Sequence, residues 1–377
     1  MTRKSEFKLP PISPLAGSSL SIVREVFRGN KVGPKYRLKV VITYIFVTVT
    51  TAFRKIDHLY FRRKLEKFRF KAPPLFIIGH WRSGTTLLHN LLTKDPFAAY
   101  TTTYQCVFPD NQKSKWLFKT FMRIFMPPVR PGDNLEISVD FPQEDEYAMS
   151  NLTHRSYYHF FYFPSAYRSL YKKYVRFETL TGEEIDDWKH LYRQMIIKAL
   201  LNSGGSRIVL KNPVNTGRML RLLEIFPEAS FVHIIRNPVI VYLSTLKFLT
   251  QLYPTLQLEP FTEEDISEMV LEIYGKLMRD YLEDRKQVDP DRILEIRYEE
   301  LVEDPIQSLE LIYQRFSYPD FPDMKTVFTD YLNSIGSHKI DSYTMSQKEL
   351  DRVMEHVGFA MKYWNYDMPD NLTIIGS

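Results

Sequence analysis

The stretch that decides the fold covers residues 75–88 and reads Leu75-Phe76-Ile77-Ile78-Gly79-His80-Trp81-Arg82-Ser83-Gly84-Thr85-Thr86-Leu87-Leu88. It follows Pro73-Pro74, which end any preceding helix, and its first four residues are all apolar. Such a continuous apolar run predicts a central strand of a parallel sheet, covered on both faces. From Thr85 to Thr93 the pattern predicts a helix. A buried strand that turns into a helix is the place where a parallel sheet presents ligands.

The rest of the chain continues this alternation of strands and helices. Four short runs predict further strands, at residues 98–103, 208–211, 231–235 and 293–297. Helical patterns lie at residues 183–203, 214–226, 238–252 and 262–288, and residues 305–363 are helical with two loops. Strands that alternate with helices of this length predict βαβ units with right-handed crossovers. The expected fold class is therefore α/β, with a central parallel β-sheet flanked by helices in three layers.

Composition narrows the class of protein before any site is considered. The chain has 377 residues, of which 44% are hydrophobic, so it can bury a large core and is not disordered. Its single cysteine, Cys106, excludes a disulfide scaffold and a zinc site built on paired thiolates.

The net charge of +5 is divided unevenly along the chain. Residues 1–71 carry 17 lysines and arginines against four acidic residues, a net charge of +13, whereas residues 72–377 carry a net charge of −8. This asymmetry predicts a basic helical N-terminal arm, residues 1–71, followed by one separately folded acidic domain, residues 72–377. The arm is expected to face something anionic. A membrane surface fits better than nucleic acid, because the arm contains an uncharged apolar run with basic residues at both ends.

The arm contains an uncharged apolar run of 14 residues, Val40–Phe53, with basic residues at both ends. This run is shorter than the roughly 20 residues of a spanning helix. It also begins too far from Met1 to be a signal peptide. Two interpretations remain open, a helix packed on the main domain and a helix attached to a membrane surface. We expect the protein to be cytoplasmic. The second interpretation of the apolar run adds peripheral attachment to a membrane through the arm.

The turn after the first strand has the composition of an anion site. The backbone N–H groups of residues 83–86, the helix N-terminus and the hydroxyls of Thr85 and Thr86 would form a cradle for an anion. Gly79 and Gly84 have the spacing of a nucleotide P-loop, but Thr85 stands where the P-loop lysine belongs. The cation comes three residues earlier, at Arg82. The sequence therefore predicts a P-loop-like fold built for a nucleotide other than ATP.

With these residues in place, the chain resembles the sulfotransferases that use 3′-phosphoadenosine 5′-phosphosulfate (PAPS). Their 5′-phosphosulfate loop reads Lys/Arg-Ser-Gly-Thr-Thr, as Arg82–Thr86 does here. Their second signature is an arginine at the end of a strand and a serine eight residues later, which Arg236 and Ser244 match. The resemblance implies that Arg82, Ser83, Gly84, Thr85 and Thr86 bind the 5′-phosphosulfate. It also implies that Arg236 and Ser244 bind the 3′-phosphate.

Three further matches extend the resemblance over most of residues 72–377. Lys211, followed by Asn212-Pro213, resembles the Lys-x-Pro element whose lysine stabilises the transition state in the tyrosyl-protein branch. Tyr298 falls in an Arg-Tyr-Glu-Glu-Leu element similar to one whose tyrosine lies near the nucleotide. Lys339 lies in the late loop that folds over PAPS in relatives. The reaction so implied places Arg82 and Lys211 around the sulfonate and requires no metal.

The general base is predicted from position and chemistry. Cytosolic relatives use a histidine about 60 residues beyond the loop cation, and Glu144 stands 62 residues past Arg82. We expect Glu144 to accept the proton of the acceptor hydroxyl. Asp145, Glu146 and His80 remain alternatives, and a proline followed by acidic residues is also an ordinary helix start.

The acceptor is indicated only broadly. Residues 147–177 are rich in tyrosine and phenylalanine, which either pack in a core or form a wall for an apolar or aromatic alcohol or lipid. We expect transfer of a sulfonate to a hydroxyl or amine of such an acceptor. Two other classes stay open, a P-loop small-molecule kinase and a membrane-associated adapter with an inactive nucleotide site.

Overall fold

The computed structural model describes residues 13–126, 138–319, 321–335 and 342–375. The chain forms two compact units that alternate along the sequence. The helical unit comprises Met1–Phe70, Tyr100–Gly204 and Phe248–Glu263, and the sheet unit comprises Lys71–Ala99, Gly205–Lys247 and Glu264–Ser377. These units reflect contacts in space, so the expected division into an arm, residues 1–71, and a domain, residues 72–377, stays a prediction.

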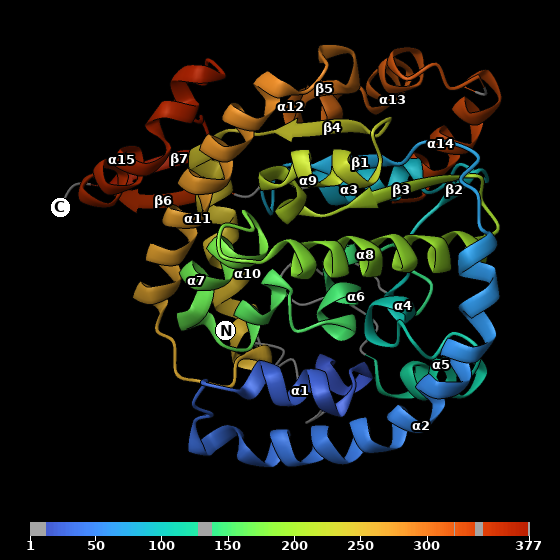
Figure 1. The fold of residues 1–377 in the computed structure, drawn as a ribbon. Helices are drawn as coiled ribbons and strands as arrows, with labels where there is room; N and C mark the ends of the chain where they lie inside the picture. The colour runs from blue at the N-terminus through green and yellow to red at the C-terminus, as the bar shows by residue number, and fades with distance from the viewer. Residues whose placement is uncertain (1–12, 127–137, 320, 336–341, 376–377) are drawn as a thin grey trace. The chain divides into compact units, whose positions relative to one another are not determined.

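A five-stranded parallel sheet forms the centre of the sheet unit (Figure 1), with the strand order β2-β3-β1-β4-β5. β1 pairs with β3 and β4, which places Phe76 opposite Leu210 on one side and opposite Phe231 on the other. The prediction of an α/β fold with a central parallel sheet is confirmed. The strands are β1 (Leu75–Ile78), β2 (Ala98–Ala99), β3 (Arg207–Lys211), β4 (Ser230–Ile235) and β5 (Ile293–Arg297).

Helices cover both faces of this sheet because successive strand residues point to opposite sides. On one face Leu75 and Ile77 pack with apolar residues of α3, α13 and α14. On the other face Phe76 stacks on Phe231 at 5.5 Å, and His233 lies 3.9 Å from the ring of Tyr281 in α11. The helices are α3 (Thr85–Leu92), α9 (Met219–Ile225), α11 (Glu263–Asp284), α12 (Tyr298–Glu303), α13 (Pro305–Arg315), α14 (Phe321–Ile335) and α15 (Gln347–Tyr363).

Three short 3₁₀ helices and a second, two-stranded parallel sheet complete the sheet unit. They are η5 (Pro213–Gly217), η6 (Arg285–Gln287) and η7 (Pro290–Arg292), with β6 (Tyr343–Ser346) and β7 (Leu372–Ile375). The helix α10 (Pro238–Leu256) begins in the sheet unit and ends in the helical unit.

Helices build the other unit throughout its described part. They are α1 (Leu20–Phe27), α2 (Arg37–Lys67), α4 (Thr103–Val107), α5 (Lys115–Phe125), α6 (Asp145–Leu152), α7 (Tyr167–Tyr174) and α8 (Gly182–Ser203), with the 3₁₀ helices η1 (Pro14–Gly17), η2 (Pro34–Tyr36), η3 (Tyr157–Phe161) and η4 (Pro164–Ala166). The aromatic residues of η3 are buried and contact one another, for example Phe160 and Phe161 at 4.2 Å. This packing favours the core interpretation of the aromatic segment.

Two elements differ from the sequence prediction. The strand predicted at 98–103 ends at Ala99, because Thr102 caps α4 and forms a reciprocal capping box with Gln105. The apolar run 40–53 is part of a much longer helix, since α2 has 31 residues. By length and composition alone, an 18-residue window within Pro34–Lys67 is apolar enough to cross a membrane, and 17% of that window is buried.

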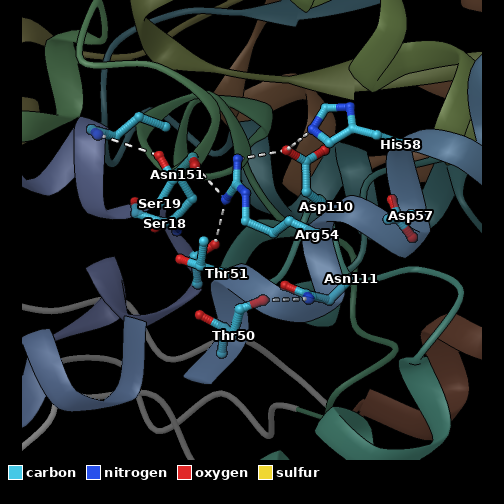
Figure 2. A network of polar contacts seen from close by, with 12 residues as sticks. Ser18, Ser19, Thr50, Thr51, Arg54, Asp57, His58, Asp110, Asn111 and Asn151 are labelled. Atoms are coloured by element: carbon cyan, nitrogen blue, oxygen red, sulfur yellow. Dashed lines mark hydrogen bonds and ion pairs between the residues drawn. The ribbon is translucent and has the colours of Figure 1, made fainter. Parts of the chain in front are cut away.

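A buried network of charges joins α2 to the rest of the helical unit (Figure 2). Arg54 donates to Asp110 at 2.6 Å, and Lys198 contacts both Asp110, at 2.7 Å, and Asp57, at 2.9 Å. Burial raises the pKa of Asp110. The charges of Lys198 and Arg54 lower this pKa by more than burial raises it, so it lies at about 2. Two cations and two carboxylates thus balance their charges inside the unit, which offsets the cost of removing them from water.

Candidate functional site

The predicted loop leaves the carboxyl end of β1 and leads into α3, and two glycines make its path feasible. Gly79 has a φ of +134° and Gly84 a φ of +104°. A Cβ atom would lie 2.6 Å from the carbonyl oxygen of Ile234 at Gly79, and 2.4 Å from the ring of Tyr298 at Gly84. Only glycine fits both the space and the backbone conformation at these two positions.

Arg82 is the centre of the polar contacts that the loop makes. Its Nε donates to Ser244 Oγ at 3.1 Å, and its carbonyl oxygen accepts a hydrogen bond from Arg236 Nη1 at 2.9 Å. Its φ is +67°, in the left-handed region that a residue with a Cβ seldom adopts. Backbone strain of this kind persists where surrounding contacts hold it, and it concentrates at ligand sites.

Arg236 and Tyr298 close the other side of the same cluster. Arg236 follows β4, and its guanidinium lies 4.0 Å from the centre of the Tyr298 ring, a cation–π distance. Tyr298 begins α12 directly after β5, and burial raises the pKa of its hydroxyl. The structure therefore brings together five of the residues predicted to bind the nucleotide, which are Arg82, Gly84, Arg236, Ser244 and Tyr298.

The N-terminus of α3 has no side-chain cap, because its N-cap residue is Gly84. Thr85 is buried and Thr86 is half-buried in the first turn of this helix. Ser83 donates through Oγ to the carbonyl of His80 at 2.8 Å, which fixes the turn. A helix start without a capping side chain, following a glycine loop, has the chemistry of an anion site.

Lys211 is the last residue of β3 and is buried at the same edge of the sheet. Its backbone lies opposite Ile77 in the register with β1. Burial lowers the pKa of the nearby His89 to about 3, with a further lowering by the charge of Lys211. The ammonium of Lys211 therefore faces a neutral imidazole at neutral pH.

His80, the alternative base in the loop, is buried and neutral at pH 7. Its Nδ1 lies 2.9 Å from the carbonyl oxygen of Trp81 and donates to it in the matching tautomer. Burial lowers its pKa to about 4. Its Nε2 atom has no hydrogen-bond partner in the part of the chain that the structure describes.

The three candidate carboxylates at the start of α6 belong to the helical unit and differ in their partners. Glu144 is the N-cap residue of α6 and accepts a hydrogen bond from the hydroxyl of Tyr158. Asp145 accepts one from Tyr192. Glu146 accepts hydrogen bonds from Ser156 Oγ at 2.8 Å and from the Tyr157 amide at 3.0 Å, which start η3. The contacts of Glu146 are those of a structural residue, and Glu144 stays the predicted base.

Sequence reasoning missed several side chains that hold the site, and Lys339 lies outside the described residues. Thr216 Oγ1 accepts a hydrogen bond from the Gly79 amide at 2.8 Å, and Thr245 Oγ1 donates to the Trp81 carbonyl at 3.2 Å. Thr216 follows the strand predicted at 208–211 by five residues and Thr245 is next to Ser244, so the sequence indicated their neighbourhood but not their hydrogen-bond partners. Tyr158 lies 14 residues after Glu144 with the helix α6 between them, a separation over which sequence spacing predicts no contact.

Comparison with known proteins places the chain among characterised enzymes. Residues 73–323 match the sequence model of the sulfotransferase family. The chain is 32% identical over 328 residues to the omega-hydroxy-beta-dihydromenaquinone-9 sulfotransferase Stf3 of Mycobacterium bovis, which covers 86% of this chain and 84% of that protein. The protein of the same name from Mycobacterium tuberculosis matches over the same length with the same identity.

Two solved structures share the fold at low sequence identity. The sulfotransferase STF9 from Mycobacterium avium has a TM-score of 0.70 at 16% identity, covering 92% of this chain and 90% of that one. The sulfotransferase STF1 from Mycobacterium tuberculosis has a TM-score of 0.64 at 16% identity, covering 89% of this chain and 90% of that one. At this identity the likeness concerns the fold alone.

Proposed function

The chain belongs to the sulfotransferase family, and from this premise we propose that it transfers the sulfonate group of PAPS to a hydroxyl of a lipid acceptor. When bound, PAPS supplies a sulfonate already joined to a phosphate leaving group. In the transfer step the acceptor oxygen loses its proton to a base and forms a bond to sulfur. The bond between sulfur and the bridging phosphate oxygen breaks, and PAP leaves with that electron pair.

The observation that carries the proposal is the contact between the two predicted signatures. Arg82 from the first signature bonds to Ser244 of the second, and Arg236 bonds back to the carbonyl of Arg82. Segments about 150 residues apart in the chain are thus joined at the ends of adjacent strands, β1 and β4. The contact supports one binding site for a ligand with two anionic groups, which is the charge distribution of PAPS.

The residues of the sheet unit fit a phosphorylated nucleotide. The loop between Gly79 and Gly84 leads into the start of α3, which has no side-chain cap and favours an anion. We assign the 5′-phosphosulfate to residues 82–86 and the 3′-phosphate to Arg236 and Ser244, whose guanidinium and hydroxyl are suitable donors. Tyr298, under the Arg236 guanidinium, would contact the nucleotide.

The chemical step needs positive charge at the sulfonate and a base at the acceptor. We assign the charge to Arg82 and Lys211, which both lie at the carboxyl edge of the parallel sheet. We assign the base to Glu144, whose carboxylate is oriented by the hydroxyl of Tyr158. Buried cations stabilise developing negative charge more strongly than exposed ones, because water does not screen them.

The proposal of a lipid acceptor rests on the relatives named above, whose name describes sulfonation of an omega-hydroxylated dihydromenaquinone. We propose an acceptor of the same chemistry, a long apolar chain that ends in a hydroxyl group. A cytoplasmic enzyme at a membrane surface would meet such a substrate. Membership of the sulfotransferase family favours sulfonate transfer over the two other classes, a P-loop small-molecule kinase and a membrane-associated adapter with an inactive nucleotide site.

Thermal denaturation with different nucleotides tests the nucleotide assignment. PAP should raise the melting temperature, because a ligand that binds only the native state stabilises it by mass action, whereas ATP with magnesium should not. A response to ATP-magnesium alone would support the kinase instead.

The acceptor is tested by sulfonate transfer from PAPS to a detergent-solubilised polyprenyl alcohol, compared with a short-chain alcohol. Equal rates for the two would contradict a lipid acceptor.

A further inference from the structure

The long helix α2 buries mainly polar residues and exposes a row of aliphatic ones. Its inward stripe consists of residues at positions 43, 47, 50, 54, 57 and 61, and four of these six are polar, namely Thr43, Thr50, Arg54 and Asp57. Its outward stripe is aliphatic, with side chains that are 50 to 77% exposed, namely Leu38, Val41, Ile45, Val49, Ile56 and Leu59. A surface helix in water normally shows the opposite arrangement.

The inward polar residues fix the rotation of α2 about its own axis. Thr43 Oγ1 accepts a hydrogen bond from the Ser13 amide at 3.3 Å, and Thr50 Oγ1 donates to Ala16 at 3.3 Å. Arg54 donates to Gly17 at 3.0 Å and lies in the charge network described above (Figure 2). Turning the aliphatic stripe inward would break these bonds and leave buried groups without partners.

The same network argues against a spanning helix. Arg54 and Asp57 lie in the second half of α2, and both are held by partners from other segments of the helical unit. If α2 crossed a bilayer, these charges would leave their partners and enter hydrocarbon, at a cost of several kcal/mol. A helix that stays docked can only lie along a membrane, with its outward stripe in the interface.

Basic residues surround the outward stripe of α2. Residues 31–71 carry 12 lysines and arginines against two acidic residues, and one residue of each sign, Arg54 and Asp57, is buried. The neighbouring helix α5 packs on α2 through aromatic pairs, Phe46 with Phe121 at 4.9 Å and Phe53 with Phe118 at 5.3 Å. α5 also exposes Trp116, which is 73% accessible, and tryptophan is enriched at membrane–water interfaces.

We propose that the outward stripe of α2 docks in the interface of an anionic membrane, with the helix axis parallel to the surface. Aliphatic side chains would enter the boundary between headgroups and acyl chains, while the surrounding lysines and arginines attract anionic headgroups. A second copy of the chain is a poorer occupant of this face, because it would bring the same positive charge against itself. The inference rests on the proposed function in one respect, because an enzyme with a lipid acceptor needs access to a membrane surface.

Vesicle binding of the full-length protein tests the proposal. The protein should sediment with vesicles of phosphatidylcholine mixed with phosphatidylglycerol, and added salt should weaken the binding because it screens the basic residues. The double substitution Ile45→Gln and Val49→Gln should lower the partition coefficient about tenfold or more. The matched control is Leu311→Gln with Val327→Gln, which removes two exposed aliphatic residues from α13 and α14 and should leave binding unchanged.

The variants also separate this inference from the proposed function. All four positions are exposed, so melting temperatures and PAP-induced stabilisation should be the same in both variants and the parent. Loss of vesicle binding in the α2 variant with intact transfer to a solubilised acceptor supports the docking face. Unchanged vesicle binding in that variant overturns it, as does a dimer in lipid-free solution that the α2 variant abolishes. Vesicle binding without any sulfonate transfer would overturn the proposed function and leave the docking face standing.

Discussion

Replacement of Asp110 by asparagine should release α2 from the helical unit. Asp110 accepts hydrogen bonds from Arg54 (Figure 2) and from Lys198, and the three side chains are buried. The difference between the usual pKa of 3.8 and the value of about 2 corresponds to roughly 2 kcal/mol of stabilisation. The substitution also leaves an excess positive charge buried, and breaking a buried ion pair on one side typically costs about 3–5 kcal/mol.

Hydrogen exchange measures this effect on the helix itself. If α2 opens locally, the loss of about 3 kcal/mol should speed exchange of its amides around Arg54 by roughly two orders of magnitude. The matched control is Asp291→Asn, which breaks an exposed ion pair with Arg315 and should leave exchange unaltered. Exchange in α2 that is no faster in the Asp110 variant than in the parent would refute the view that the network holds the helix.

The same carboxylate predicts a pH dependence with a definite sign. The folded-state pKa of Asp110 is lowered, so its contribution is present in full above a pH of about 4 and is lost as the pH falls through about 2. The urea midpoint of the parent protein should therefore fall over this window. In Asp110→Asn the fall should be shallower, because asparagine does not titrate. Parallel curves for the two proteins would contradict the assignment.

Three further predictions concern the site. Glu144→Gln should lower the turnover number at least a hundredfold, with PAP affinity by calorimetry within about twofold; retained turnover would remove Glu144 as the base. Gly84→Ala should abolish measurable PAP binding, because its Cβ has no room and the φ is +104°, whereas Gly182→Ala meets no atom within 4 Å and should bind PAP normally. Ser244→Ala removes both a phosphate donor and the partner of Arg82 Nε, so PAP should bind about tenfold more weakly; unchanged affinity would place the 3′-phosphate elsewhere.

Continuous apolar strands and the order of motifs made the sheet and its binding edge predictable. Buried parallel strands must be apolar on both faces, so Leu75–Ile78 and Ser230–Ile235 were recognisable without knowledge of their partners. The adjacency of Arg82 and Ser244 followed because parallel strands end at one edge of a sheet. The contact of Thr216 with Gly79 depends on the course of η5, which local sequence does not encode.

The helical unit was less predictable for a physical reason. Its long helix α2 buries Thr43, Thr50 and Arg54 while most of its aliphatic residues are exposed, so the usual relation between apolar periodicity and burial fails. At the start of α4 the apolar run through Ala98–Ala99 suggested a longer strand, although the Thr-x-x-Gln pattern of a capping box was present at Thr102. Local capping outweighed strand propensity there.

The left-handed backbone of Arg82 has an evolutionary consequence. Glycine would adopt its φ of +67° freely, so the arginine is kept there against a conformational preference of about 1 kcal/mol or more. A descendant that no longer needed the guanidinium would relax this position toward glycine or asparagine. On the proposed assignment of Arg82 to the sulfonate, the residue at position 82 would mark retained activity, and its identity should help to separate working enzymes from inactive copies when genomes are surveyed.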